Sequence, residues 1–198
     1  MLDTSEDLDV CAVELGCSVE QLFSPLTRFT DRHPERRKAA DNGGFKGLNI
    51  PAYLALLKRE EHQREKFRFI TVPDIVASAR RTLELFDYWY TRLEGWPLAL
   101  VAQDGQEDLP IPWGQIDAIF IGGSTEFKMS QAAADIIRTA RAMEKWTHVG
   151  RVNDPERWTH FEDLKVGSVD GTGIARYSHM RLAIKNRGAS PQMSFLEE

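Results

Sequence analysis

The sequence predicts an α/β fold, a compact (β/α)8-type TIM barrel that is incomplete or modified at this length. Short apolar runs alternate with helical patterns along the 198 residues, which is typical of parallel β/α units. Five segments place a polar residue or a glycine pair just after a strand: "AADNGGF", "TVPD", "VAQDG", "IGGS" and "SVDGTG". Strand ends converge on one mouth in a barrel but spread along an edge in an open sheet, so these segments favour the barrel.

The predicted strands are short apolar runs of the kind that forms buried strands. They comprise residues 67–72, 98–102, 118–121, 147–149 and 167–169. Asn42-Gly43, which precedes the first of these runs, is one of the strongest turn dipeptides. We therefore expect a turn at the end of "AADNGGF" and parallel strands after it.

Helical patterns fill the intervals between these strands. One begins near Pro51, which suits a first helical turn, and runs through "AYLALLKREEHQREK". Another covers residues 74–94 and ends at Gly95, which suits a C-cap. A third begins at Ser130, and a short fourth begins at "NDPERW", where Asp154 is the predicted cap.

Composition predicts a single domain over residues 1–198, with 42% hydrophobic and 28% charged residues. The apolar runs are too short to span a bilayer, and the acidic N-terminus does not resemble a signal peptide, so we expect a cytoplasmic protein. Cys11 and Cys17 are then expected to be free thiols. The histidines lack HxxxH or HxH spacing, which argues against a metal site.

Several residues that follow the predicted strands could act together. Any one of the aspartates could simply cap a helix or form an Asx-turn. Together, carboxylates, a carboxamide and exposed backbone N–H groups would bind a ligand rich in hydrogen-bonding groups, such as a purine with an oxo group and an amine. An aromatic ring could stack on that purine. The residues are Asp41, Asp74, Asp170, Gln103, Gly122, Gly123 and Phe45.

Five of these motifs carry a resemblance to a known family. "ADNGGFK" resembles the Asp-Ser-Gly-Gly-aromatic motif of the tRNA-guanine transglycosylases. It is followed, in the same order as in that family, by "TVPD", "VAQDG", "IGGS" and "SVDGTGIAR". The likeness covers roughly residues 38–176 and is greatest to the shorter phage and actinobacterial branch, which inserts 7-deazaguanine bases into DNA.

The resemblance implies a role for each of these residues and requires no cofactor. Asp170 would be the nucleophile at the sugar C1′, and Asp41 the general acid and base. Asp74 would accept from the N–H and amine groups of the base. The oxo group of the base would be bound by Gln103 and by the backbone of Gly122 and Gly123, and Phe45 would stack on the ring. Retaining glycosidases likewise use one carboxylate as the nucleophile and a second as the general acid and base.

The resemblance also implies that DNA is the polymer. The tRNA enzymes carry a zinc-binding cluster of three cysteines and a histidine, which this sequence lacks, and Lys46 replaces their glutamine after the aromatic residue. Basic residues lie before the Asp41 loop and after the Asp170 strand. We expect them to flank the barrel mouth and hold phosphates. They are Arg36, Arg37, Lys38, Arg176 and Arg181.

Two alternatives remain open on the sequence alone. "IGGSTEFK" could bind phosphate through backbone N–H groups, which would make the protein a barrel enzyme acting on a phosphosugar or nucleotide. The chain could instead be a barrel that binds nucleic acid without catalysis. The sequence leaves open which 7-deazaguanine derivative (a preQ0-like base being the prototype) is inserted and whether the protein is a homodimer.

Overall fold

A computed structural model describes residues 8–26 and 33–186 of the chain. Its centre is a seven-stranded, all-parallel sheet in which every strand pairs with its neighbour in sequence, in the order β1 to β7. The strands are β1 Gln21–Phe23, β2 Lys38–Ala40, β3 Phe67–Thr71, β4 Leu98–Ala102, β5 Ala118–Ile121, β6 Trp146–Val149 and β7 Ser168–Val169.

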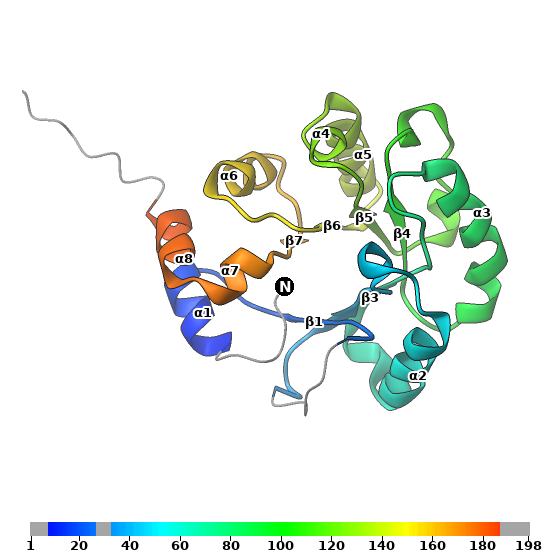
Figure 1. Cartoon of the computed structure of the whole chain (residues 1–198), viewed down its shortest axis with the longest axis horizontal. Coiled ribbons are helices and arrows are strands. Elements are labelled where there is room, and N and C mark those ends of the chain that lie inside the picture. Colours follow the sequence, from blue (N-terminus) through cyan, green and yellow to red (C-terminus); the bar gives the residue numbers. More distant parts are fainter. Residues whose placement is uncertain (1–7, 27–32, 187–198) are drawn as a thin grey trace, which may run out of the picture.

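Helices cover the convex side of this curved sheet. Figure 1 shows α2 to α6 arranged around the outside of the strands, with α1, α7 and α8 grouped together at the side that the sheet leaves open. The helices are α1 Leu8–Leu15, α2 Ile50–Glu60, α3 Ala79–Trp89, α4 Thr125–Lys128, α5 Gln131–Ala142, α6 Pro155–Asp163, α7 Thr172–Arg176 and α8 Ser178–Lys185. Within the described residues, no helix is long and apolar enough to cross a membrane.

The prediction of a TIM barrel is wrong, because the sheet is an open half-barrel. In the part of the chain that the structure describes, β1 and β7 form the two edges and do not pair with each other. A TIM barrel closes with eight tilted strands in matched register. Here the edge strands span only three and two residues, which leaves little backbone to hydrogen-bond across the gap. Closure fails for that reason, although the strands are parallel and follow chain order.

Side chains pack on both faces of the sheet. The larger core lies between the sheet and its helices and includes Ile70, Leu100 and Ile119. The adjacent strand residues Phe69 and Val101 face the other way and join a smaller cluster on the concave face. The concave face is therefore filled by side chains, as the inside of a barrel would be, and this alternation decides which strand-end residues point into it.

The apolar runs predict five strands correctly but miss two. β4 and β5 have the predicted bounds, and β3, β6 and β7 differ by one residue. The segments of β1 and β2 were not predicted because "QLF" and "KAA" are short and polar at their first residue. Lys38 nevertheless is fully buried, with its ammonium 5.3 Å from the centre of the Phe23 ring and 4.0 Å from the Glu60 carboxylate.

The predicted helix starts are confirmed for three helices. α2 begins at Ile50, with Pro51 in its first turn. The Ser130 hydroxyl accepts from the Ala133 N–H at the start of α5, and the Asp154 carboxylate accepts from the Arg157 N–H at the start of α6. The helix predicted to begin near Asp74 begins at Ala79 instead. Asp74 does not cap it because its carboxylate accepts hydrogen bonds from two other side chains.

Asn42 joins the carboxyl ends of β2 and β3. Its side-chain amide donates to the hydroxyl of Thr71 (2.9 Å), to the carbonyl of Val72 (3.2 Å) and to the carboxylate of Asp74 (2.7 Å). Its side-chain oxygen accepts from the Gly44 N–H at 2.8 Å. The turn dipeptide predicted from sequence is thus also a buried connection between strands.

Replacing Asn42 with alanine should lower the free energy of unfolding by about 2 to 4 kcal/mol, because a buried carboxylate and a backbone N–H lose their partner. Chemical denaturation at neutral pH measures this. Asn49→Ala is the matched control: Asn49 is exposed and caps α2 by accepting from the Ala52 N–H, so its loss should cost only about 1 kcal/mol. Equal costs for the two variants would contradict the role assigned to Asn42.

Candidate active site

The carboxyl ends of six strands line one cavity of about 80 Å³ on the concave side of the sheet. Its apolar part is formed by Val101 and Phe120, and polar groups surround them. All seven residues predicted to form the site are present in its wall, so the convergence expected from the sequence is observed even though the barrel is open. The lining residues are Asp41, Gly44, Phe45, Asp74, Val76, Val101, Gln103, Phe120, Gly122, Gly123, Lys128, Gly150, Arg151 and Asp170.

Asp74 and Gln103 bind each other within this wall. The Gln103 amide donates to one oxygen of Asp74 at 2.6 Å, while Asn42 donates to the other at 2.7 Å. The Gln103 carbonyl oxygen accepts from the Ala77 N–H at 2.9 Å. Burial raises the pKa of Asp74, although both amide donors oppose this. This network holds the ends of β2, β3 and β4 together and fixes the Asp74 carboxylate in the cavity.

Asp41 follows β2 and is half-buried at the edge of the cavity. Burial, together with the charges of Asp170 and Asp74, raises its pKa to about 7. Hydrogen bonds from the N–H groups of Gly43 and Asn42 oppose the rise. Near neutral pH the Asp41 carboxyl is therefore divided between its protonated and ionised forms, as a group that both gives and takes a proton should be.

Asp170, directly after β7, is held in the opposite state. Burial would raise its pKa, but a hydrogen bond from His148 and another from the Arg151 N–H outweigh it and the pKa is lowered. The contacts are 3.0 Å from His148 Nε2 to Oδ2 and 3.1 Å from the Arg151 nitrogen to Oδ1. Asp170 is thus an oriented, ionised carboxylate in the same cavity as the more readily protonated Asp41.

His148 is the end of a chain of hydrogen bonds that fixes Asp170. It is fully buried on β6, between the rings of Phe69 and Phe120. Its Nδ1 lies 2.8 Å from the Ser168 hydroxyl oxygen, which also accepts from the indole N–H of Trp146 at 3.0 Å. Burial lowers the pKa of His148 despite its bond to Asp170, so the ring is neutral and carries one proton.

The direction of this chain follows from its last acceptor. An ionised carboxylate can only accept, so neutral His148 carries its single proton on Nε2 and donates it to Asp170. His148 Nδ1 then accepts from the Ser168 hydroxyl, whose oxygen accepts from the indole N–H of Trp146. We name the three residues Trp146, Ser168 and His148 the donor chain. Nothing in the sequence pattern marks His148 for this role, although β6 places it on the concave face opposite Phe120 and Ser168.

The glycine pair and Phe45 line the cavity, but the Gly122 N–H and one face of the Phe45 ring already have partners within the protein. The N–H of Gly122 donates to the Ala102 carbonyl as a continuation of the sheet. Gly123 has a φ of 72°, and a β-carbon there would lie 2.5 Å from an Asp104 oxygen, so glycine is required. Phe45 is 58% exposed, and the guanidinium of Arg151 lies 3.6 Å from its ring centre. A stacking base would have to replace Arg151 on that face of the ring.

The basic residues predicted to flank the mouth are mostly elsewhere. Arg36 and Arg37 precede β2 and Lys38 is its first residue, so they lie at the opposite end of the strand from Asp41. Lys38 is fully buried, and Arg181 is 7% exposed because it donates to Glu14 and to the carbonyls of residues 174 and 175. Only Arg176, at the end of α7, is exposed on a segment that follows a strand.

Different cations lie beside the site. Lys128, from "IGGSTEFK", lines the cavity and is 6% exposed. Burial lowers its pKa, the charges of Arg151 and Arg157 lower it further, and Asp170 acts in the opposite direction. Its ammonium donates to the Gly150 carbonyl at 3.0 Å. A four-residue helix leaves no periodicity to mark Lys128 in the sequence.

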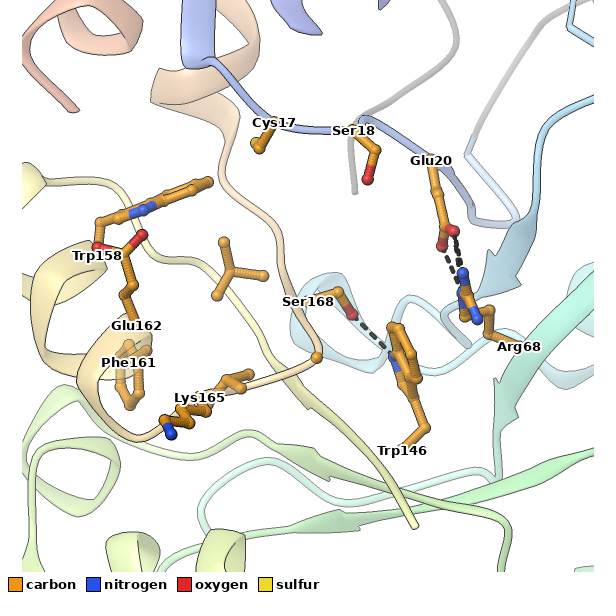
Figure 2. A pocket seen from close by; sticks show the side chains of 13 residues that line it. Cys17, Ser18, Glu20, Arg68, Trp146, Trp158, Phe161, Glu162, Lys165 and Ser168 are labelled. Atoms are coloured by element: carbon orange, nitrogen blue, oxygen red, sulfur yellow. Dashed lines mark hydrogen bonds and ion pairs between the residues drawn. The ribbon is translucent and has the colours of Figure 1, made fainter. Parts of the chain in front are cut away.

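A second cavity, of about 380 Å³, lies at the opposite end of the sheet, where the amino ends of β3, β6 and β7 meet the segment before β1. Figure 2 shows Trp158 and Phe161 on one side of it and the Glu20–Arg68 ion pair on the other. Trp146 and Ser168 belong to its wall and to the donor chain. Its charged pair, Glu20 and Arg68, and its polar pair, Trp146 and Ser168, already bind each other. This cavity therefore offers a ligand fewer unsatisfied polar groups than the cavity at the carboxyl ends.

Neither cavity contains the elements of a metal centre. Among the described residues, no group of three or more histidine, cysteine, aspartate or glutamate side chains could hold a metal ion. Cys11 is buried and Cys17 is exposed, and neither forms a disulfide, as predicted.

Comparison with known proteins bears on the fold alone. No protein-family model matches the chain, and no curated protein matches it. Among solved structures, the chain is similar to the crystal structure of the Amycolatopsis orientalis BexX/CysO complex, with a TM-score of 0.56 and 11% sequence identity. The likeness covers 96% of this chain and 87% of that chain. The chemistry of the site thus has to be inferred from its own residues.

Asp41 should make the stability of the protein depend on pH. Its pKa in the folded chain lies above that of the unfolded chain, so its favourable contribution is present at low pH and is lost as the pH rises through about 7. Asp41→Asn should therefore stabilise the protein at pH 8 relative to wild type. The expected gain in the free energy of unfolding is on the order of 3 kcal/mol, because solvent at the cavity mouth screens part of the cost of ionising the Asp41 carboxyl. Denaturation at pH 5 and pH 8 measures this. A difference between the two proteins that is the same at both pH values would refute it.

Removing the donor chain should change the ionisation of Asp170. In His148→Phe, burial acts on Asp170 with one donor fewer, so its pKa should rise. Carbon-13 NMR of the aspartate carboxyls, titrated from pH 2 to 8, reports this directly. Ser168→Ala should produce a smaller rise, because His148 keeps its contact with Asp170 but loses its orienting partner. An unchanged Asp170 titration in His148→Phe would show that the contact with His148 does not lower the pKa of Asp170.

Proposed function

We propose that the protein is a guanine transglycosylase that exchanges guanine in DNA for a 7-deazaguanine base, preQ0-like in type, through a covalent aspartyl-glycosyl intermediate. The observation that carries this proposal is the carboxylate pair. Asp170 and Asp41 line one cavity, and their surroundings shift their pKa values in opposite directions. Carboxyl groups with separated pKa values in one site are the arrangement that glycosidic chemistry uses for its nucleophile and its acid.

The reaction can be written with these two groups. An ionised oxygen of Asp170 attacks the sugar C1′, the C1′–N9 bond breaks, and protonated Asp41 supplies a proton to the leaving guanine. Asp41, now ionised, takes the N9 proton of the incoming base, whose N9 attacks C1′ and releases the Asp170 carboxylate. A pKa near 7 suits Asp41 to both proton transfers. The donor chain keeps Asp170 ionised for the first step and stabilises it again as the leaving group in the second.

The cavity wall supports a planar polar base as the ligand. Val101 and Phe120 supply an apolar surface, and Asp74 presents a carboxylate oriented by Asn42 and Gln103. Asp74 retains lone pairs that could accept from the amine and N–H of guanine. The cavity of about 80 Å³ adjoins another of about 500 Å³ that shares Asp41, Phe45, Arg151 and Asp170 with it. Separation of Phe45 from Arg151 would open a path between the two.

DNA as the polymer is favoured by the sequence resemblance to the DNA-modifying branch. A base inside a duplex would have to be flipped out to meet Asp170, so mismatched or single-stranded sites should react more readily. The phosphosugar alternative is less favourable. The N–H and hydroxyl of Ser124, in the predicted phosphate-binding loop, both donate to the carboxylate of Asp104, so neither is available to a phosphate.

Asp170→Asn should lower base exchange by about three orders of magnitude or more, because it removes the nucleophile. Asp41→Asn should also be severely impaired. The assay measures incorporation of radiolabelled guanine and of labelled preQ0 into single-stranded DNA, duplex DNA and tRNA. Asp87→Asn, which changes an exposed aspartate on α3, is the control and should exchange normally.

Each outcome of this assay decides a separate part of the proposal. Substantial exchange by Asp170→Asn would exclude it as the nucleophile, and no exchange by wild type into any polymer would end the transglycosylase proposal. Incorporation into tRNA alone would replace the polymer and leave the chemistry standing. A denaturation-resistant adduct of wild type with DNA, absent from Asp170→Asn, would identify the covalent intermediate.

A further inference from the structure

A further cavity, of about 200 Å³, adjoins the carboxylate site. It shares Phe45, Gly123, Lys128 and Arg151 with the deep cavity, so a ligand could extend from one to the other. Three cationic side chains line it: Lys128 from α4, Arg151 from the loop after β6, and Arg157 from α6. None of the three was predicted from the sequence to bind a ligand.

The positive charge in this cavity is only partly compensated. Arg157 pairs with Asp154 at 2.7 Å, while Lys128 donates to a backbone carbonyl. The guanidinium of Arg151 lies on the Phe45 ring and, among the described residues, makes no ion pair with a carboxylate. Besides burial, the charges of Arg151 and Arg157 both lower the pKa of Lys128, so each guanidinium repels the Lys128 ammonium. The charges of Asp170 and Asp104 raise the pKa of Lys128 and so compensate part of this repulsion.

Hydrogen-bonding groups accompany these charges. Thr125 and Asn153 add polar groups to its wall, whereas the donors of Ser124 are held by the Asp104 carboxylate. A guanidinium binds a phosphate through two parallel N–H donors, and a nearby ammonium adds a third strong donor. The cavity thus offers an anion both guanidinium and ammonium donors. A bound anion would also relieve the repulsion between Lys128 and the two arginines.

We propose that the cavity lined by Lys128, Arg151 and Arg157 is a subsite for a phosphate group of the DNA backbone next to the reacting nucleotide. This inference rests on the proposed function, since that places the sugar C1′ at Asp170. The phosphates on the 5′ and 3′ sides of that sugar are only a few bonds from C1′, and the subsite shares Lys128 and Arg151 with the wall that contains Asp170. A phosphate there would draw Arg151 from the ring of Phe45 and free that ring for the base.

The test is the salt dependence of binding to a fluorescein-labelled single-stranded oligodeoxynucleotide, measured by anisotropy. Arg151→Gln and Arg157→Gln should each weaken binding about tenfold at low salt and reduce the slope of log K against log salt by about 0.7 to 1. Arg138→Gln, on an exposed position of α5 where it pairs with Asp135, is the control and should change neither quantity. Thermal melts confirm that the variants are folded.

The source of the phosphate is distinguished by competition. Deoxyguanosine monophosphate should displace the oligonucleotide more effectively than deoxyguanosine, and Arg151→Gln should remove that difference. Ribose 5-phosphate competing as well as the nucleotide would overturn the assignment to DNA, because a small phosphosugar would then be the ligand. Unchanged salt slopes in both arginine variants, with base exchange present in wild type, would overturn the subsite but not the transglycosylase. The expected slopes without any exchange would retain the subsite and reject the transglycosylase.

Discussion

The site depends on one constraint: carboxylates that lie at the carboxyl ends of parallel strands are taken partly out of water and must find donors. Asp74 is satisfied by the amides of Asn42 and Gln103, and Asp170 by His148 and the Arg151 N–H. A buried charge without such donors would cost several kcal/mol. Each set of donors comes from strands other than the one that ends in the carboxylate, so satisfying the charge also joins neighbouring strand ends.

Asp41 is the exception on which function depends. Burial and the charges of Asp170 and Asp74 raise its pKa, and only backbone donors oppose them. Asp170 is equally taken out of water, but the hydrogen bonds from His148 and the Arg151 N–H lower its pKa. A general acid and a nucleophile are thus produced from the same residue type, because one buried carboxylate has a side-chain donor and the other has two anionic neighbours.

The open sheet does not prevent this arrangement. Active sites of closed barrels use strand ends from all round the mouth, whereas here β2 to β7 supply the whole cavity wall and the gap lies between β7 and β1. Helices α1, α7 and α8 pack together through Cys11, Leu15, Ile174 and Ile184. That cluster lies at the open side in Figure 1 and buries its own apolar surface without pairing the edge strands.

How far the site could be predicted from the sequence depended on where each residue stands relative to a strand. Asp74, Gln103 and Asp170 follow predicted apolar runs, and Asp41 follows the two alanines of β2. Parallel strands place such residues at one edge whatever the tertiary details. The basic residues before β2 were misplaced for the same reason: a residue that precedes a strand lies at its other end. Gln103 and Asp74 were found, but not their mutual hydrogen bond, because that contact joins residues 29 positions apart.

The sequence by itself thus determined the parallel α/β layout, five of the seven strands, and the set of polar groups that meets in the cavity. These follow from local periodicity and from the direction of the chain. Closure of the sheet, the donor chain through His148, and the cations beside the site were decided only by the tertiary structure. They depend on contacts between distant segments: two edge strands too short to pair, a histidine whose partners come from β7, and Lys128 in a helix too short to show periodicity.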